Sequence, residues 1–102
     1  MSQTKLLLVD DEVEFASALA ERLQMRDYEV KTANNELKAL GLIPEYKPDV
    51  VILDLRISNI DGIETLKTIK KYDKSIEVIM LTGHGDVKSV REGMSSGAFE
   101  YI

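Results

Sequence analysis

The stretch Val50-Val51-Ile52-Leu53-Asp54 decides the fold class, because four consecutive apolar residues end abruptly in an acid. A short run that is apolar at every position is typical of a strand covered on both faces, as in a parallel sheet. A second such run, residues 6–9, is followed at once by Asp10 and Asp11. The two runs predict two buried strands whose carboxyl ends carry carboxylates.

Amphipathic stretches alternate with these runs. The first has apolar residues four positions apart, at Phe15, Leu19 and Leu23. This spacing predicts a helix of about three turns whose apolar stripe packs against the sheet. After a short strand over residues 28–32, Asn34 or Asn35 can cap a weaker helix through Ile43, which Pro44 is expected to end.

The second half of the chain repeats the alternation. A polar loop over residues 56–62, with a turn at Asp61-Gly62, precedes helical spacing of apolar residues that starts at Ile63. Residues 76–81 form the next apolar run, Asp86 can cap a helix that Gly97 ends, and residues 98–102 resemble the start of a fifth strand. Strand and helix in alternation predict one α/β domain over residues 1–102, with right-handed crossovers and helices on both faces of a parallel sheet.

Composition narrows the functional classes. Thirteen Lys and Arg against 18 Asp and Glu give a net charge of −5, which argues against a general nucleic-acid-binding surface. The chain has no cysteine, so it has neither a disulfide framework nor a thiolate metal site. No segment is apolar and long enough to cross a membrane, and the amino terminus does not read as a signal peptide. We expect a cytoplasmic protein.

Polar residues gather where the predicted strands end. The carboxyl ends of parallel strands meet at one edge of the sheet, so Asp10, Asp11, Asp54 and Thr82 should converge there. Clustered carboxylates repel one another unless a cation neutralises them, and Mg²⁺ suits a few carboxylates plus water and phosphate oxygens. A carboxylate can also accept a phosphoryl group. We expect Asp54 to be that acceptor, with Asp10 and Asp11 holding the ion and Thr82 bonding a phosphoryl oxygen.

Four motifs in this order resemble the receiver domain of two-component response regulators. They are Leu6-Leu7-Leu8-Val9-Asp10-Asp11-Glu12, Val50-Val51-Ile52-Leu53-Asp54-Leu55, Asp61-Gly62 and Met80-Leu81-Thr82-Gly83-His84-Gly85. The ending Gly97-Ala98-Phe99-Glu100-Tyr101-Ile102 is similar to the family's approach to its fifth strand. The resemblance covers essentially the whole chain and implies a chemotaxis-receiver-like, flavodoxin-like doubly wound sheet of strand order 2-1-3-4-5 within three α/β/α layers.

The resemblance implies a role for each matching residue. Asp54 is expected to be the phosphoacceptor and also a metal ligand. Asp11 would ligate Mg²⁺ (or Mn²⁺) directly, Asp10 would act mostly through a bound water, and the backbone carbonyl of Arg56 would complete the protein's ligands. The switch would consist of the Thr82 hydroxyl and the Tyr101 ring. The implied partners are a sensor histidine kinase and an output domain outside this chain, which would control transcription or another response; the domain would not itself be an enzyme.

Two departures from the family pattern accompany the resemblance. Ser58 stands where the family usually has Pro, and the chain ends before the position of an essential lysine and the final helix. We therefore expect a truncated receiver whose sheet has one face and one edge exposed, and that forms a homodimer to cover them.

Other interpretations of these residues stay open. Asp10-Asp11-Glu12 could merely cap a helix, and Thr82 could be a structural hydroxyl. His84 and Arg56 could tune the lifetime of the acyl phosphate. Two alternative functions are a receiver-like interaction module that is never phosphorylated and an aspartyl-nucleophile phosphohydrolase. The latter usually needs an acid two residues after the nucleophile, where this chain has Arg56.

Overall fold

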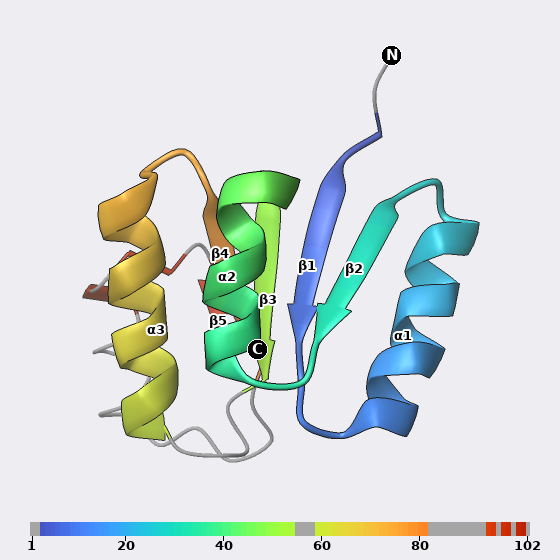
Figure 1. Cartoon of the computed structure of the whole chain (residues 1–102), viewed down its shortest axis with the longest axis horizontal. Coiled ribbons are helices and arrows are strands. Elements are labelled where there is room, and N and C mark those ends of the chain that lie inside the picture. The colour runs from blue at the N-terminus through green and yellow to red at the C-terminus, as the bar shows by residue number, and fades with distance from the viewer. Residues whose placement is uncertain (1–2, 55–58, 82–93, 96, 99, 102) are drawn as a thin grey trace.

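The computed structural model describes residues 3–54, 59–81, 94–95, 97–98 and 100–101. Their strands form one parallel sheet in the order β2-β1-β3-β4-β5, which confirms the predicted topology (Figure 1). The strands are β1 Lys5–Val9, β2 Glu29–Ala33, β3 Val50–Asp54, β4 Glu77–Leu81 and β5 Glu100–Tyr101. The sequence placed each of the first four within two residues of its observed bounds. For β1, β3 and β4 the reason is that short apolar runs suit the interior of a parallel sheet, whereas β2 is a mostly exposed strand at the end of the strand order.

Helices cover the sheet, as expected for an α/β domain. They are α1 Val13–Met25, α2 Glu36–Tyr46 and α3 Asn59–Tyr72. Figure 1 shows α2 and α3 side by side over one face of the sheet, with α1 beyond β2. The helix expected between Asp86 and Gly97 lies mostly outside the described residues. At its end, Gly97 has a positive φ of 106° and donates its N–H to Met94 O at 3.2 Å, as a glycine that stops a helix does.

The main core lies between the sheet and the α2–α3 layer. Alternate residues of the central strands point into it and are almost fully buried: Leu7, Val9, Val51, Leu53, Val78 and Met80. Side chains of α2 and α3 pack on them: Ala39, Ile43, Tyr46, Ile63, Leu66 and Ile69. On the opposite face, which α1 covers beside β1 and β2, Leu6 and Leu8 are buried whereas Ile52 and Ile79 are only half-buried.

The predicted apolar stripe of α1 is wrong in one respect. Phe15 is 41% exposed, and Leu19 and Leu23 are only half-buried, whereas the buried residues of the helix are Ala16 and Ala20. The small side chains let the helix backbone approach the sheet closely, so the larger residues flank the contact. Periodicity located the correct side of the helix but not the residues at its centre.

Two helix boundaries also differ from the prediction. Helix α2 continues past Pro44 to Tyr46, because burial of Tyr46 outweighs the single backbone hydrogen bond that proline cannot donate. Asn35, one of the two predicted caps, accepts the N–H of Lys38 at 2.8 Å. Helix α3 begins at Asn59, so Asp61-Gly62 lies in its first turn rather than in a loop.

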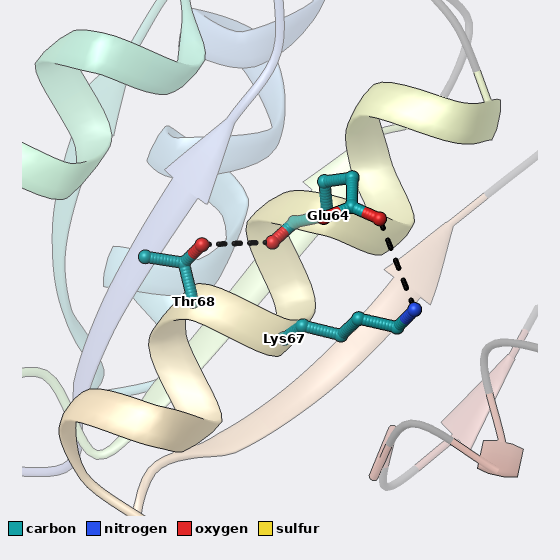
Figure 2. Close-up of polar contacts among 3 residues, drawn as sticks. All are labelled: Glu64, Lys67 and Thr68. Carbon is teal, nitrogen blue, oxygen red and sulfur yellow. Dashed lines mark hydrogen bonds and ion pairs between the residues drawn. The ribbon is translucent and has the colours of Figure 1, made fainter.

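The lysines of α3 differ in their surroundings. Lys67 Nζ lies 3.8 Å from Glu64 Oε1, one turn away, and Thr68 donates its hydroxyl to Glu64 O at 2.9 Å (Figure 2). Lys70 differs, because its ammonium donates to two carbonyls of the turn before β4, Lys74 O at 3.1 Å and Ile76 O at 2.8 Å. Lys67 is therefore a surface residue, and Lys70 holds a turn together.

Candidate functional site

Asp10 follows β1, and both its main chain and its side chain form hydrogen bonds. Its N–H donates to Ala33 O at 3.0 Å, which continues the β1–β2 pairing by one residue. Its Oδ1 accepts the N–H of Glu12 at 2.9 Å, at the start of α1. The side chain is 1% exposed, and within the part of the chain that the structure describes its other oxygen, Oδ2, is buried without a hydrogen-bond partner.

Asp54 occupies the equivalent position one strand away. It is the last residue of β3 and is 7% exposed. Val9 pairs with Leu53 in the parallel register, so Asp10 and Asp54 leave neighbouring strands at the same level. We call these two residues the acid pair; it lies at the edge toward which the strand arrows of Figure 1 point.

Burial and neighbouring charge disfavour ionisation of Asp10. The pKa of Asp10 is raised, first because burial removes water from its carboxylate. The hydrogen bond from the Glu12 amide opposes this rise, but the nearby Asp54 carboxyl and the Asp11 charge both favour the neutral form. A cation placed between the carboxylates would reverse this balance.

Asp11 lies differently from the acid pair. Its side chain is exposed, although its charge still reaches Asp10. Over residues 3–54, 59–81 and the short described segments near the carboxyl end, no three acidic or imidazole side chains gather as a ready-made metal site. The buried Oδ2 of Asp10 nevertheless fits a hard cation, since it is an oxygen ligand without a donor among the described residues. Asp10 and Asp54 could hold such an ion, with Asp11 turning toward it.

The remaining predicted site residues are not placed by the structure. Arg56, Thr82 and His84 lie outside the described residues. The backbone of Tyr101 belongs to β5 and pairs with Met80, but its side chain is likewise outside what the structure describes. The capping interpretation of the first acidic run is partly correct: Glu12 is the N-cap residue of α1, but its side chain forms no capping hydrogen bond, and Asp10 binds its amide instead.

Sequence reasoning missed the surroundings of Asp10. A cleft of about 430 Å³ opens beside it, between α1, the end of β2 and α2, and includes Lys38 and Gly41 in its lining. The one available signal was Gly41 inside a helical stretch. A glycine there costs about 1 kcal/mol of helix stability relative to alanine, so its presence indicates a packing or functional role.

The fold and the acid pair define a class of protein: a doubly wound α/β domain with buried carboxylates at the carboxyl edge of its central strands. The family model of the response regulator receiver domain matches residues 6–102. The chain belongs to the response regulator receiver domain family.

Two curated relatives show how the chain compares with longer proteins. It is 36% identical over 102 residues to sporulation initiation phosphotransferase F of Bacillus subtilis, covering 100% of this chain and 82% of that protein. It is 39% identical over 100 residues to the transcriptional regulatory protein ZraR of Klebsiella oxytoca, covering 98% of this chain. The chain spans only 23% of the length of ZraR.

Solved structures agree on the fold. A CheY-like response regulator receiver domain protein from Methanospirillum hungatei superposes with a TM-score of 0.92 at 25% identity, over 99% of this chain and 81% of that one. A response regulator protein from Burkholderia pseudomallei, described with a phosphorylated aspartic acid, calcium ion and citrate, gives a TM-score of 0.89 at 27% identity, over 97% of this chain and 58% of that one. The doubly wound, CheY-like fold predicted from the sequence is confirmed.

None of the helices in the described part of the chain is long and apolar enough to span a bilayer.

Proposed function

We propose that this receiver domain accepts a phosphoryl group on Asp54 in the presence of Mg²⁺ or Mn²⁺. The observation that carries the proposal is the acid pair, whose members are both buried at the carboxyl edge while Oδ2 of Asp10 has no donor among the described residues. Burying carboxylates in this way destabilises a fold, and groups of this kind cluster at functional sites. The phosphorylated aspartic acid and calcium ion described in the Burkholderia relative support the same chemistry.

The chain's own residues would divide the work at this edge. A carboxylate oxygen of Asp54 forms the new bond to phosphorus while the bond from phosphorus to the donor breaks, and the donor leaves with that electron pair. Asp10, Asp11 and the carbonyl of Arg56 would hold the divalent ion, which when bound neutralises charge on the phosphoryl oxygens. Oδ1 of Asp10 is already engaged by the Glu12 amide, so Oδ2 is the oxygen left for the ion or for its water.

Two residues, Thr82 and Tyr101, would read out the phosphoryl group. Thr82 would donate its hydroxyl to a phosphoryl oxygen, and the Tyr101 ring would follow it. Arg56 and His84, each two residues beyond an active-site position, would tune how long the acyl phosphate survives.

Receiver domains take phosphoryl groups from sensor histidine kinases, and relatives such as ZraR are much longer than this chain. We extend this to the present domain: a sensor histidine kinase would be the donor, and an output domain would read the result. The domain would act as a switch rather than a multiple-turnover enzyme, in the cytoplasm, away from membrane and nucleic acid, and would form a homodimer.

The direct test is labelling with a small phosphodonor such as phosphoramidate. Intact-protein mass should show one added phosphoryl group with Mg²⁺ and none with excess chelator. Asp54→Asn should abolish the label, whereas Asp49→Asn, a matched change at the opposite end of the sheet, should leave it unchanged. Equal labelling of Asp54→Asn and the unmodified chain would disprove the assignment of the acceptor.

A further inference from the structure

Strand β2 forms an open edge of the sheet. It stands first in the strand order and, among the described strands, pairs with β1 alone. Its residues are exposed or half-buried except Ala33, which is buried. An edge of this kind carries main-chain groups that can pair with a strand of another chain. The edge is therefore a candidate interaction surface.

The hydrogen bonds toward β1 show which main-chain groups of β2 face outward. Glu29 N–H and Ala33 O each form a 3.0 Å hydrogen bond with a residue that flanks β1. Parallel pairing engages every second residue of a strand, so Lys31, between these two, also faces β1. The N–H and C=O groups of Val30 and Thr32 then point away from β1, on the side where no described strand lies.

Charges on β2 are complementary to those of a second copy of the same strand. In an antiparallel pair, residues that face outward lie opposite each other. If Val30 lies opposite Val30 of the second copy, Glu29 of each copy lies opposite Lys31 of the other, at a position where side chains are close. If Val30 lies opposite Thr32 instead, Lys31 faces Lys31, and like charges repel. The charges therefore favour one two-fold register.

The same register brings an exposed aromatic ring toward the cleft beside Asp10. Tyr28, one residue before β2, is 38% exposed and would lie opposite Thr32 of the second copy. Thr32 lines the cleft of about 430 Å³, together with residues of α1 and α2 that include Gly41. A Cβ atom on Gly41 would meet no other atom within 4 Å, so the cleft has room for a large side chain. Two-fold symmetry would place one ring in each of the two clefts.

We propose that this chain forms a symmetric dimer through the β2 edges, with the strands antiparallel and Val30 on the two-fold axis. Main-chain hydrogen bonds would join the edges, Glu29 would pair with Lys31 across them, and Tyr28 would enter the opposite cleft. The interface is small because the strand is short, so we expect a Kd on the order of 100 μM. The proposal rests on the homodimer of the proposed function and assigns its surface; it is independent of phosphoryl transfer to Asp54.

The test is sedimentation velocity of the chain at low salt, over a concentration range of about 10 μM to about 1 mM. The unmodified chain should dimerise within this range. Lys31→Glu and Glu29→Lys each place like charges opposite one another, so each variant should dimerise at least about tenfold more weakly. An equimolar mixture of the two variants restores both opposite-charge pairs and should form a heterodimer about as tight as the unmodified dimer.

The mixture is the decisive measurement, because a variant that had lost its fold could not regain affinity on mixing. A mixture that stays as weak as its components would overturn the proposal, and so would undiminished dimerisation of either variant alone. A monomeric unmodified chain would overturn the β2 surface and the homodimer together. Phosphodonor labelling of Asp54 reports separately on the acceptor function.

A second pair of variants tests the ring in the cleft. Tyr28→Ala should weaken dimerisation at least about tenfold, because both rings leave the interface. Tyr72→Ala removes a ring that is 60% exposed on α3, away from β2, and should dimerise normally. Amide NMR signals of Ser17 and Gly41, which line the cleft, should shift with concentration in the unmodified chain. Equal dimerisation of the two variants, or cleft amides that never shift, would overturn the proposed register.

Discussion

The two ends of the parallel sheet differ in how their buried polar groups are hydrogen-bonded. At the amino-terminal end, Tyr46 is buried and donates its hydroxyl to Glu29 O at 3.2 Å, while the ammonium groups of Lys31 and Lys5 lie 5.0 and 5.6 Å from its ring centre. Asp49 accepts the N–H of Lys5 at 2.8 Å. At the carboxyl end, the acid pair is buried and Oδ2 of Asp10 has no donor among the described residues.

This contrast separates stability from function within one small domain. A satisfied polar network contributes modestly to stability with every hydrogen bond, about 0.5–1.5 kcal/mol each. A buried carboxylate without a donor costs stability instead, and such groups cluster at functional sites. The following substitutions should therefore act in opposite directions at the two ends.

The largest effect is expected for Asp10→Asn. Asn can still accept the Glu12 amide, but it removes the buried charge that faces Asp54. In chelator, urea unfolding should show a gain of about 2–3 kcal/mol in the free energy of unfolding. Mg²⁺ affinity should fall at least about tenfold. Asp11→Asn, at an exposed position, should change metal-free stability by less than about 0.5 kcal/mol. A loss of metal-free stability in Asp10→Asn would contradict the comparison.

The pH dependence of the metal-free protein should follow from Asp10. Its folded-state pKa is raised above the ordinary value of 3.8, so its contribution to stability is full below pH 3.8 and is lost as the pH rises through the folded pKa. Unfolding curves of Asp10→Asn should lack this loss. Saturating Mg²⁺ should also remove it, because the ion stabilises the charged form.

Lys70→Met probes the amino-terminal end of the sheet, and its effect on the free energy of unfolding should be the next largest. The change keeps most of the apolar stem but removes the ammonium that donates to Lys74 O and Ile76 O, so stability should fall by about 2 kcal/mol. The measurement is the urea midpoint at constant slope. Phosphodonor labelling of Asp54 should continue at the original rate in folded protein; a selective loss of labelling would mean that the two ends are coupled.

Tyr46→Phe should have a smaller effect, about 1 kcal/mol of lost stability, because only the hydrogen bond to Glu29 O disappears. Burial raises the pKa of Tyr46 to about 12 from the ordinary 10. The hydroxyl's contribution is therefore full below pH 10 and is lost as the pH rises from 10 to about 12. Denaturation of both proteins across this range should show the difference shrinking; a constant difference would argue against the buried phenol.

Lys67→Met should show the smallest effect and serves as the control for Lys70→Met. Its ion pair with Glu64 is on the solvent side of α3, so stability should change by less than about 0.5 kcal/mol (Figure 2). A loss as large as that of Lys70→Met would show that the turn contacts of Lys70 are not what distinguishes the two lysines.

Sequence patterns were sufficient to predict the strands and the acid pair, because short apolar runs and the acids that follow them have few alternative placements in an α/β fold. Apolar runs located β1, β3 and β4, and the acids that follow the first two of these located Asp10 and Asp54, since side chains after adjacent parallel strands must meet. The motifs then gave the strand order through the family resemblance. The strand positions depend on local spacing and the strand order on the resemblance, and the structure confirms both.

Tertiary packing decided what the patterns could not. Phe15 satisfies helical periodicity, yet the residue buried against the sheet is Ala16 and not Phe15, because a small side chain allows the helix nearer the sheet. Pro44 is a helix breaker by propensity, yet the burial of Tyr46 carries α2 past it. The cleft depends on the relative placement of α1 and α2, two elements far apart in the chain, which no local pattern encodes.

The two anchors of Asp10 have a thermodynamic consequence. Its main chain is fixed by Ala33 O and its side chain by the Glu12 amide, so the conformational entropy of this ligand is lost during folding rather than during binding. Capture of a cation by Asp10 should then resemble the filling of a rigid chelator: a calorimetric signal dominated by release of water from the ion, with little change in heat capacity from ordering of this part of the chain.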